Sequence, residues 1–255
     1  MIRVIINADD LGISANVNEA IRICFEKGYI TNTTLMVNMP DAQDALQIAR
    51  DGGFFDKIGL HIDITEGNPI TDAMKPFDCF CNANGSFNAN FHNSTISRLW
   101  LSAAKRRAMA TEVGAQLEQY EKLGLSQWHL DSHHHSHTDY STWKVLGKMA
   151  LSAGMKSVRI SRNIFEEGGT SLFNRIYKKF FNAKLKRSGM EVADYFGSFA
   201  DFVASYDKLA DKGDALVEIM VHPMIDKAGN LVDTDHPMKD IMDFLEDKNI
   251  VLQSY

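Results

Sequence analysis

The stretch that decides the fold is MIRVIINADDLG, residues 1–12. Residues 2–6 within it are an apolar and mostly β-branched run, which is typical of a strand buried on both faces. The run leads into two adjacent carboxylates, Asp9 and Asp10. Residues 17–28 then repeat apolar side chains at helical spacing and end in glycine, which indicates a helix. The chain therefore opens with strand, polar turn and helix, the unit from which parallel sheets are built.

The same alternation continues to the C-terminus. Further strands are predicted at residues 33–37, 58–64, 127–131, 156–160, 191–196, 215–221 and 250–252, and further helices at 41–50, 94–123, 139–153, 175–181, 202–209 and 236–247. No GxGxxG turn follows the first strand, so a dinucleotide site is unsupported. No repeat or change of composition divides the chain. We therefore predict one domain, residues 1–255, folded as a (β/α) barrel, with a doubly wound open sheet as the alternative.

Composition excludes several classes of protein. A net charge of −6 argues against a general nucleic-acid binder, which is usually basic. Three cysteines are too few for a disulfide framework and suggest a reducing compartment. The N-terminal apolar run is too short for a secretory signal, and no apolar run reaches the roughly 18 residues of a membrane span. We expect a cytoplasmic protein that binds neither nucleic acid nor membrane.

Polar side chains gather where the predicted strands end. The segment HLDSHHHSH, residues 129–137, holds five of the nine histidines. Active sites of (β/α) barrels lie at the C-terminal ends of their strands. The side chains that share this location are Asp9, Asp10, His61, Asp131, His133, Arg159 and His222.

Each of these residues has a structural explanation when taken alone. An aspartate pair can cap a helix, His61 can be a hydrogen-bonded core histidine, and Arg159 can be an ion-pair partner. Together they supply one carboxylate and two imidazoles for a metal, with positions left open for water and substrate. A further carboxylate and histidine remain for acid–base chemistry, which is what hydrolysis requires.

Four motifs carry a resemblance to a known family. NADDLG (7–12), GLH (59–61), HLDSHHHSH (129–137) and VHP (221–223) resemble the motifs of the YdjC-like carbohydrate deacetylases, which include the chitooligosaccharide deacetylases. The match runs in order along almost the whole chain and is weakest over 77–110 and 161–200.

The resemblance implies a distorted (β/α) barrel of seven or eight mostly parallel strands and a divalent metal ion, Mg²⁺ or Zn²⁺, held by Asp10, His61 and His133. It implies an N-acetylated sugar as substrate: an amino sugar or short chitooligosaccharide that loses its acetyl group as acetate. By similarity to the wider polysaccharide deacetylases, Asp9 would be the general base and His222 the general acid.

Other positions receive secondary roles or none. Asp131, His129 and Arg159 are expected to support the metal ligands or to contact substrate. His134, His135, His137 and the aromatic loop 65–93 have no assigned role. The family often forms dimers, which leaves a homodimer open, with exposed apolar residues in 161–200 as the first place to look. Basic residues at 175–187 are interpreted as a solvated helix face, with an anionic-ligand patch as the alternative.

Two other functions stay open. A metal-dependent phosphoesterase or amidohydrolase barrel also gathers His and Asp at strand ends, and His135-Ser136-His137 keeps it in view, although such a barrel would more often carry His-x-His on its first strand. A non-catalytic sugar-binding protein would bind tightly without turnover, and Asp9 would then have no role.

Overall fold

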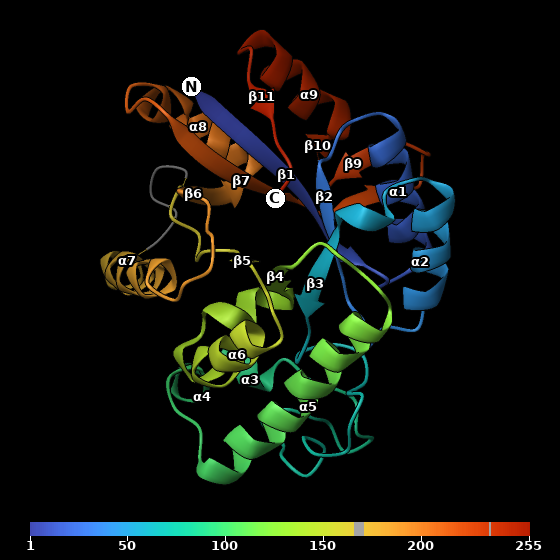
Figure 1. Ribbon diagram of the computed structural model, residues 1–255, viewed down its shortest axis with the longest axis vertical. Coiled ribbons are helices and arrows are strands. Elements are labelled where there is room, and N and C mark those ends of the chain that lie inside the picture. The colour runs from blue at the N-terminus through green and yellow to red at the C-terminus, as the bar shows by residue number, and fades with distance from the viewer. Residues whose placement is uncertain (166–170, 235) are drawn as a thin grey trace.

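A curled, parallel sheet forms a half-barrel with helices around it, which confirms the predicted distorted (β/α) barrel (Figure 1). The computed structural model describes residues 1–165, 171–234 and 236–255. The strand order is β5-β4-β3-β2-β1-β7-β6, and β11 also pairs with β1. The strands are β1 (Ile2–Leu11), β2 (Asn32–Leu35), β3 (Ile58–Ile62), β4 (His129–Ser132), β5 (Ser157–Val158), β6 (Tyr195–Ser198), β7 (Ala215–Val221) and β11 (Val251–Leu252).

The opening stretch of the sequence becomes the centre of this sheet. Strand β1 pairs in parallel with β7 along Ile2–Ala8, with β2 on its other side, and with β11 near its start. Val4, Ile5 and Ile6 have no exposed surface. Each side chain of this size contributes about 1.5–3 kcal/mol when buried, so the apolar run stabilises the middle of the fold.

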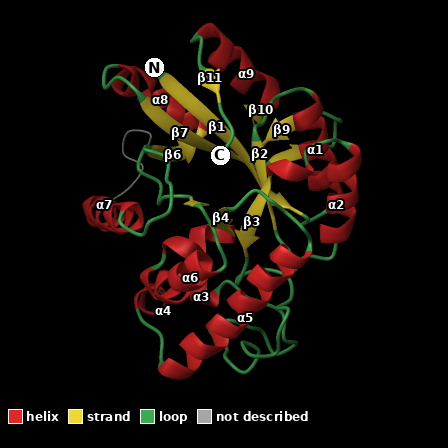
Figure 2. Cartoon of the chain, in the orientation of Figure 1, coloured by secondary structure: helices red, strands yellow, loops and turns green. Residues whose placement is uncertain are grey.

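Helices lie outside the sheet (Figure 2). Helix α1 begins after Ser14, whose side chain accepts a hydrogen bond from the Val17 amide, and it buries Ala20, Ile21 and Cys24. The helices are α1 (Ala15–Glu26), α2 (Ala42–Asp51), α3 (Asn90–Asn93), α4 (Thr95–Leu99), α5 (Ala103–Lys122), α6 (Tyr140–Ser152), α7 (Leu172–Lys186), α8 (Phe199–Ala210) and α9 (Met238–Asp247), with 3₁₀ turns at Phe55–Lys57 and His133–Thr138. No helix among the described residues combines the length and apolar content needed to cross a bilayer.

The barrel does not close between β5 and β6. Within the described chain no strand pairing joins them, and the isolated bridge from Ser157 to Glu191 is the nearest substitute. The Asn163 amide donates to the Phe196 carbonyl across the same gap, at 3.1 Å. Helix α7 lies beside this gap (Figure 1).

The structure differs from the predicted elements in four places. Strand β1 continues through Asp9 and Asp10 to Leu11, instead of stopping before them. The strand predicted at 191–196 lies at Tyr195–Ser198, and β5 is reduced to Ser157–Val158. A small antiparallel sheet of β8 (Pro223–Ile225), β9 (Leu231–Asp233) and β10 (His236–Pro237) was not predicted, because strands this short have too little periodicity to detect.

The long loop after β3 is anchored to helix α5. The buried Glu112 carboxylate accepts hydrogen bonds from the Ile70 amide at 2.9 Å and from the Thr71 amide at 2.8 Å. Gln116 bonds both the amide and the carbonyl of Asp63. The loop therefore has a defined path above the end of the sheet.

Candidate functional site

The two adjacent aspartates reach one site because β1 is irregular there. The pairing register between β1 and β2 shifts between Ala8 and Leu11, and Asp10 has a φ of 67°. Consecutive residues of a regular strand point to opposite faces, and a bulge redirects one of them. Both carboxylates can therefore join the same polar cluster at the C-terminal end of the sheet.

Asp10 faces two histidines, one in β3 and one directly after β4. Its Oδ1 lies 2.8 Å from His133 Nδ1 and 3.2 Å from His61 Nε2. The remaining ring nitrogens also face carboxylates: His61 Nδ1 lies 2.6 Å from Asp131 Oδ1, and His133 Nε2 lies 2.9 Å from Glu66 Oε2. The structure thus brings together the three predicted metal ligands, and each imidazole is oriented from behind by a carboxylate.

The carboxylates and imidazoles of this cluster stabilise each other's charged forms. Burial alone would lower the pKa of both imidazoles, but Asp131 and Asp10 hold the pKa of His61 well above its usual range, and Asp10 raises that of His133. Burial would likewise raise the pKa of the Asp10 carboxyl, yet hydrogen bonds with His133 and His61 keep it far below normal.

A divalent cation fits this donor set. One carboxylate oxygen and two imidazole nitrogens lie within 4.8 Å of one another, and Asp10 keeps part of its side chain exposed. Metal-binding histidines usually turn their other nitrogen to a carboxylate or carbonyl, as His61 and His133 do here. Three protein ligands also leave coordination positions for water and substrate.

Asp9 belongs to a second, fully buried group of charges around Arg159. The guanidinium lies 2.6 Å from Asp9 Oδ2, 2.8 Å from Asp131 Oδ2 and 2.5 Å from Glu218 Oε1. The Asn7 side chain donates a further hydrogen bond to Asp9 Oδ1 at 2.9 Å. Because Asp131 contacts both His61 and Arg159, it links this group to the Asp10 cluster.

His222 lies on the solvent side of Asp9. Its Nε2 is 3.9 Å from Asp9 Oδ2, and 43% of its side chain is exposed. The His222 amide donates to Asp233 Oδ1 at 2.8 Å, which ties the end of β7 to the small antiparallel sheet. An imidazole that substrate can reach therefore lies next to a buried carboxylate.

The histidine segment divides into buried supports and a strained turn. His129 is fully buried, bonds Ser157 and stacks on Tyr255, and burial lowers its pKa to about 3. His137 lies between Ser132 Oγ and the Arg159 carbonyl. Within the described residues, neither forms a hydrogen bond with Asp10, His61 or His133. Support by His129 therefore stays a prediction, and its contacts are those of a core residue.

The turn itself is held in an unfavourable conformation. His134 and His135 have φ values of 52° and 53°, and with Asp10 they are three of the five non-glycine residues with positive φ in the described part of the chain. Such residues cost about 1–3 kcal/mol each and concentrate at functional sites. The two strained residues directly follow His133, so the turn begins at a residue of the Asp10 cluster.

Several residues of the site were not found from the sequence. Glu66 lies in the long loop, where nothing marks it among other polar residues. Thr34 donates to Asp131 Oδ2 at 3.1 Å from within an ordinary strand. Glu218 did have a signal, because it is the one charged residue in the apolar strand ALVEIMV, residues 215–221. Asp233 lies in a segment whose strands were not predicted.

The chain is similar to a known protein family along almost its whole length. The family model of YdjC-like proteins matches residues 3–250. A carbohydrate deacetylase of Thermoanaerobacter pseudethanolicus is 27% identical over 257 residues, covering 98% of this chain and 97% of the relative. Carbohydrate deacetylases of Vibrio parahaemolyticus and Halalkalibacterium halodurans are each 30% identical over 87% of this chain. The aligned region covers 78% of the Vibrio protein and 84% of the Halalkalibacterium protein.

A solved structure shows the same fold. A protein of Enterococcus faecalis V583, to which cleavage of cellobiose phosphate has been ascribed, superposes with a TM-score of 0.73 at 20% identity. The alignment covers 99% of this chain and 97% of the other.

Proposed function

This chain belongs to the YdjC-like protein family, and from that premise we propose that it is a carbohydrate deacetylase. It is then a hydrolase that cleaves the amide bond of an N-acetylated amino sugar or short chitooligosaccharide and releases acetate. The observation that carries the proposal is that the two adjacent aspartates have different partners. Asp10 faces two imidazoles, as a metal ligand would, and Asp9 faces Arg159 and His222.

Asp10, His61 and His133 would hold one divalent ion, and two imidazoles in the set favour Zn²⁺ over Mg²⁺. Such an ion, when bound, polarises the acetyl carbonyl and makes water more acidic. Asp131 and Glu66 keep the two imidazoles in place for it through the 2.6 Å and 2.9 Å contacts with their other nitrogens.

Asp9 is the general base of this proposal. Arg159 and Asn7 fix its carboxylate by hydrogen bonds of 2.6 to 2.9 Å, so little reorganisation is needed as it takes a proton from the attacking water. Water oxygen bonds to the acetyl carbon, and the proton moves to Asp9.

His222 is the general acid. Its exposed ring lies within 3.9 Å of Asp9 and can give a proton from Nε2 to the sugar nitrogen as the carbon–nitrogen bond breaks. An amine leaves poorly without that proton. The products are acetate and the free amino sugar, and both residues return to their starting state by exchange with solvent.

The test is acetate release from di-N-acetylchitobiose by metal-reloaded protein. Asp10→Asn and Asp9→Asn should each fold, by circular dichroism, and lose nearly all activity. Asp56→Asn, an exposed aspartate outside the site, serves as the control. Full activity in either site variant would refute the scheme, and tight sugar binding without acetate release in the wild type would favour a binding protein.

A further inference from the structure

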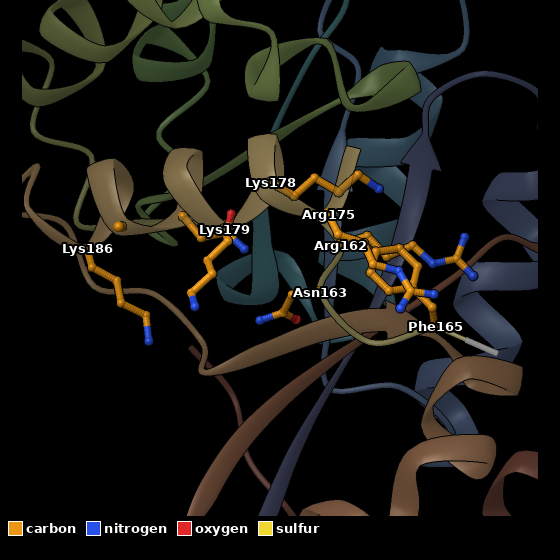
Figure 3. Close-up of a pocket in the computed structure, with 9 residues that line it drawn as sticks. Arg162, Asn163, Phe165, Arg175, Lys178, Lys179 and Lys186 are labelled. Carbon is orange, nitrogen blue, oxygen red and sulfur yellow. The ribbon is translucent and has the colours of Figure 1, made fainter. Parts of the chain in front are cut away.

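A second concave site lies beside the catalytic cluster, at the gap between β5 and β6. It is a cavity of about 460 Å³ between helix α7 and the segment 162–165. Figure 3 shows Lys179 and Lys186 extending from the helix on the side of Asn163. The cationic residues that line it are Arg162, Arg175, Lys178, Lys179 and Lys186.

The helix places these cations on one side by its periodicity. Residues 175, 178, 179, 182 and 186 recur at helical spacing and line the cavity. Leu172, Phe173, Ile176 and Phe180 of the same helix are exposed and do not line it. Helix α7 carries five cationic residues and no acidic one, in a chain whose net charge is −6. The positive charge is thus concentrated at this cavity against the overall balance of the protein.

Few of these cations have a counter-charge. Arg162 pairs with Asp201, and Lys186 lies 3.7 Å from Asp194 at the rim. Among the described residues no carboxylate forms an ion pair with Arg175, Lys178 or Lys179. Burial, together with Arg162 and Arg98, lowers the pKa of the Lys178 ammonium, which means that its charged form is destabilised at this position. A bound anion would offset that repulsion.

The walls of the cavity are held rigidly by amides. Asn182 bonds both the amide and the carbonyl of Ser161, at 2.8 and 2.7 Å. Asn163 donates to the Asp194 carbonyl and accepts from the Phe196 amide. These bonds fix the backbone on both sides of the gap between β5 and β6, and Asn182 and Asn163 use their amides on that backbone. Arg175 and Lys179 are then the cations of the cavity with no ion-pair partner among the described residues and no aromatic ring beneath them.

We propose that this cavity binds a phosphoryl group. Several donors on arginine and lysine suit the charge and the multiple oxygens of a phosphate dianion better than a single carboxylate. The site adjoins the catalytic cluster through Phe196, whose ring contacts both Arg159 and His135 while its amide bonds Asn163. The phosphoryl group belongs either to a free ion or to a phosphorylated sugar, and only the second source rests on the proposed function.

The test is calorimetric titration of the full chain at constant ionic strength, with chloride as the reference anion. The probes are inorganic phosphate, N-acetylglucosamine and N-acetylglucosamine 6-phosphate. Saturable binding of phosphate with equal affinity for the sugar phosphate identifies a site for the free ion. Tighter binding of the sugar phosphate than of either other probe identifies a phosphorylated sugar. No saturable binding of either phosphate overturns the proposal, whatever the outcome of the acetate assay.

Two double variants, one within helix α7 and one at its C-terminal end, locate the site. Arg175→Gln with Lys179→Gln removes two cations from the cavity and should weaken phosphate binding about tenfold or more, because charge-assisted hydrogen bonds are lost. Lys184→Gln with Arg187→Gln removes the same charge from a different face, which lines another cavity, and should weaken binding less than about twofold. Equal weakening in both variants would overturn the assignment to this cavity.

Discussion

Replacing Asp131 by asparagine tests the link between the two charged groups of the site. Asp131 is fully buried, and its two oxygens serve different partners: Oδ1 faces His61 Nδ1 at 2.6 Å, and Oδ2 faces Arg159 at 2.8 Å and Thr34 Oγ1 at 3.1 Å. Asparagine keeps the volume but offers one acceptor oxygen and a donor NH₂. Either His61 or Arg159 must then face a donor.

The expected loss follows from these contacts. One hydrogen bond to a charged partner contributes about 1.5–3 kcal/mol. Breaking a buried ion pair outright costs about 3–5 kcal/mol, but Arg159 keeps Asp9 and Glu218 in this variant. We therefore expect Asp131→Asn to reduce the free energy of unfolding by about 2–3 kcal/mol. Loss of the carboxylate behind His61 should also weaken metal affinity about 10- to 100-fold.

Two assays separate these effects. Urea unfolding gives the stability, and acetate release measured against metal concentration gives the affinity of the site for the ion. Glu218→Gln is the matched control, because it removes another carboxylate from Arg159 at a fully buried position without contacting His61. It should destabilise the fold similarly and leave metal affinity within about threefold of wild type, since no residue behind a ligand has changed.

The reasoning fails in either of two cases. A folded Asp131→Asn protein with wild-type metal affinity would show that the carboxylate does not orient His61. Equal weakening of metal binding by Asp131→Asn and Glu218→Gln would show that metal affinity depends on the stability of the whole buried group around Arg159 and not on the carboxylate next to His61.

Three further predictions follow from buried polar groups. Burial raises the pKa of the Asp139 carboxyl from 3.8 to about 6. The free energy of unfolding of the wild type should therefore fall by about 2–3 kcal/mol as the pH rises from about 4 to 6 and this carboxyl loses its proton. Asp139→Asn should flatten that dependence in calorimetry at a series of pH values. Glu112→Gln should cost about 2 kcal/mol and increase hydrogen exchange at Ile70 and Thr71, and unchanged exchange there would contradict the anchoring of the loop. Tyr120→Phe should cost about 1–2 kcal/mol in urea unfolding, because the single Tyr120 hydroxyl proton is shared between the Ile58 carbonyl at the start of β3 and the Gln127 carbonyl before β4. An unchanged free energy of unfolding would show that this hydrogen bond adds nothing.

Much of the fold could be predicted because its signals are local. The β-branched run at 2–6 and the clear strand at 215–221 correspond to β1 and β7, which pair at the centre of the sheet. Elements with little local signal were predicted too long or not at all: β5 has only two of the five predicted residues, and β8 to β10 form a sheet from pairings between short segments. Their stability comes from neighbours, which a local pattern does not contain.

The site shows the same division at the level of single residues. Aspartate and histidine at strand ends indicated Asp10, His61 and His133, and the structure brings these three together. The sequence placed Asp9 and Asp10 after the strand, whereas the structure keeps both inside β1 and separates their partners by a bulge. Glu66 was missed, because a loop residue acquires its role only from the path of the loop.

By itself, the sequence determined the parallel architecture and the chemistry available at the ends of its strands, because hydrophobic periodicity and residue type are local properties. Only the tertiary structure decided which groups meet. Asp10 contacts His133 across 123 residues, and Arg159 contacts Asp9 across 150. The same assembly left the barrel open between β5 and β6 and turned one basic face of α7 into a cavity. Contacts over such separations depend on how strands pair and helices pack, and no stretch of sequence specifies them alone.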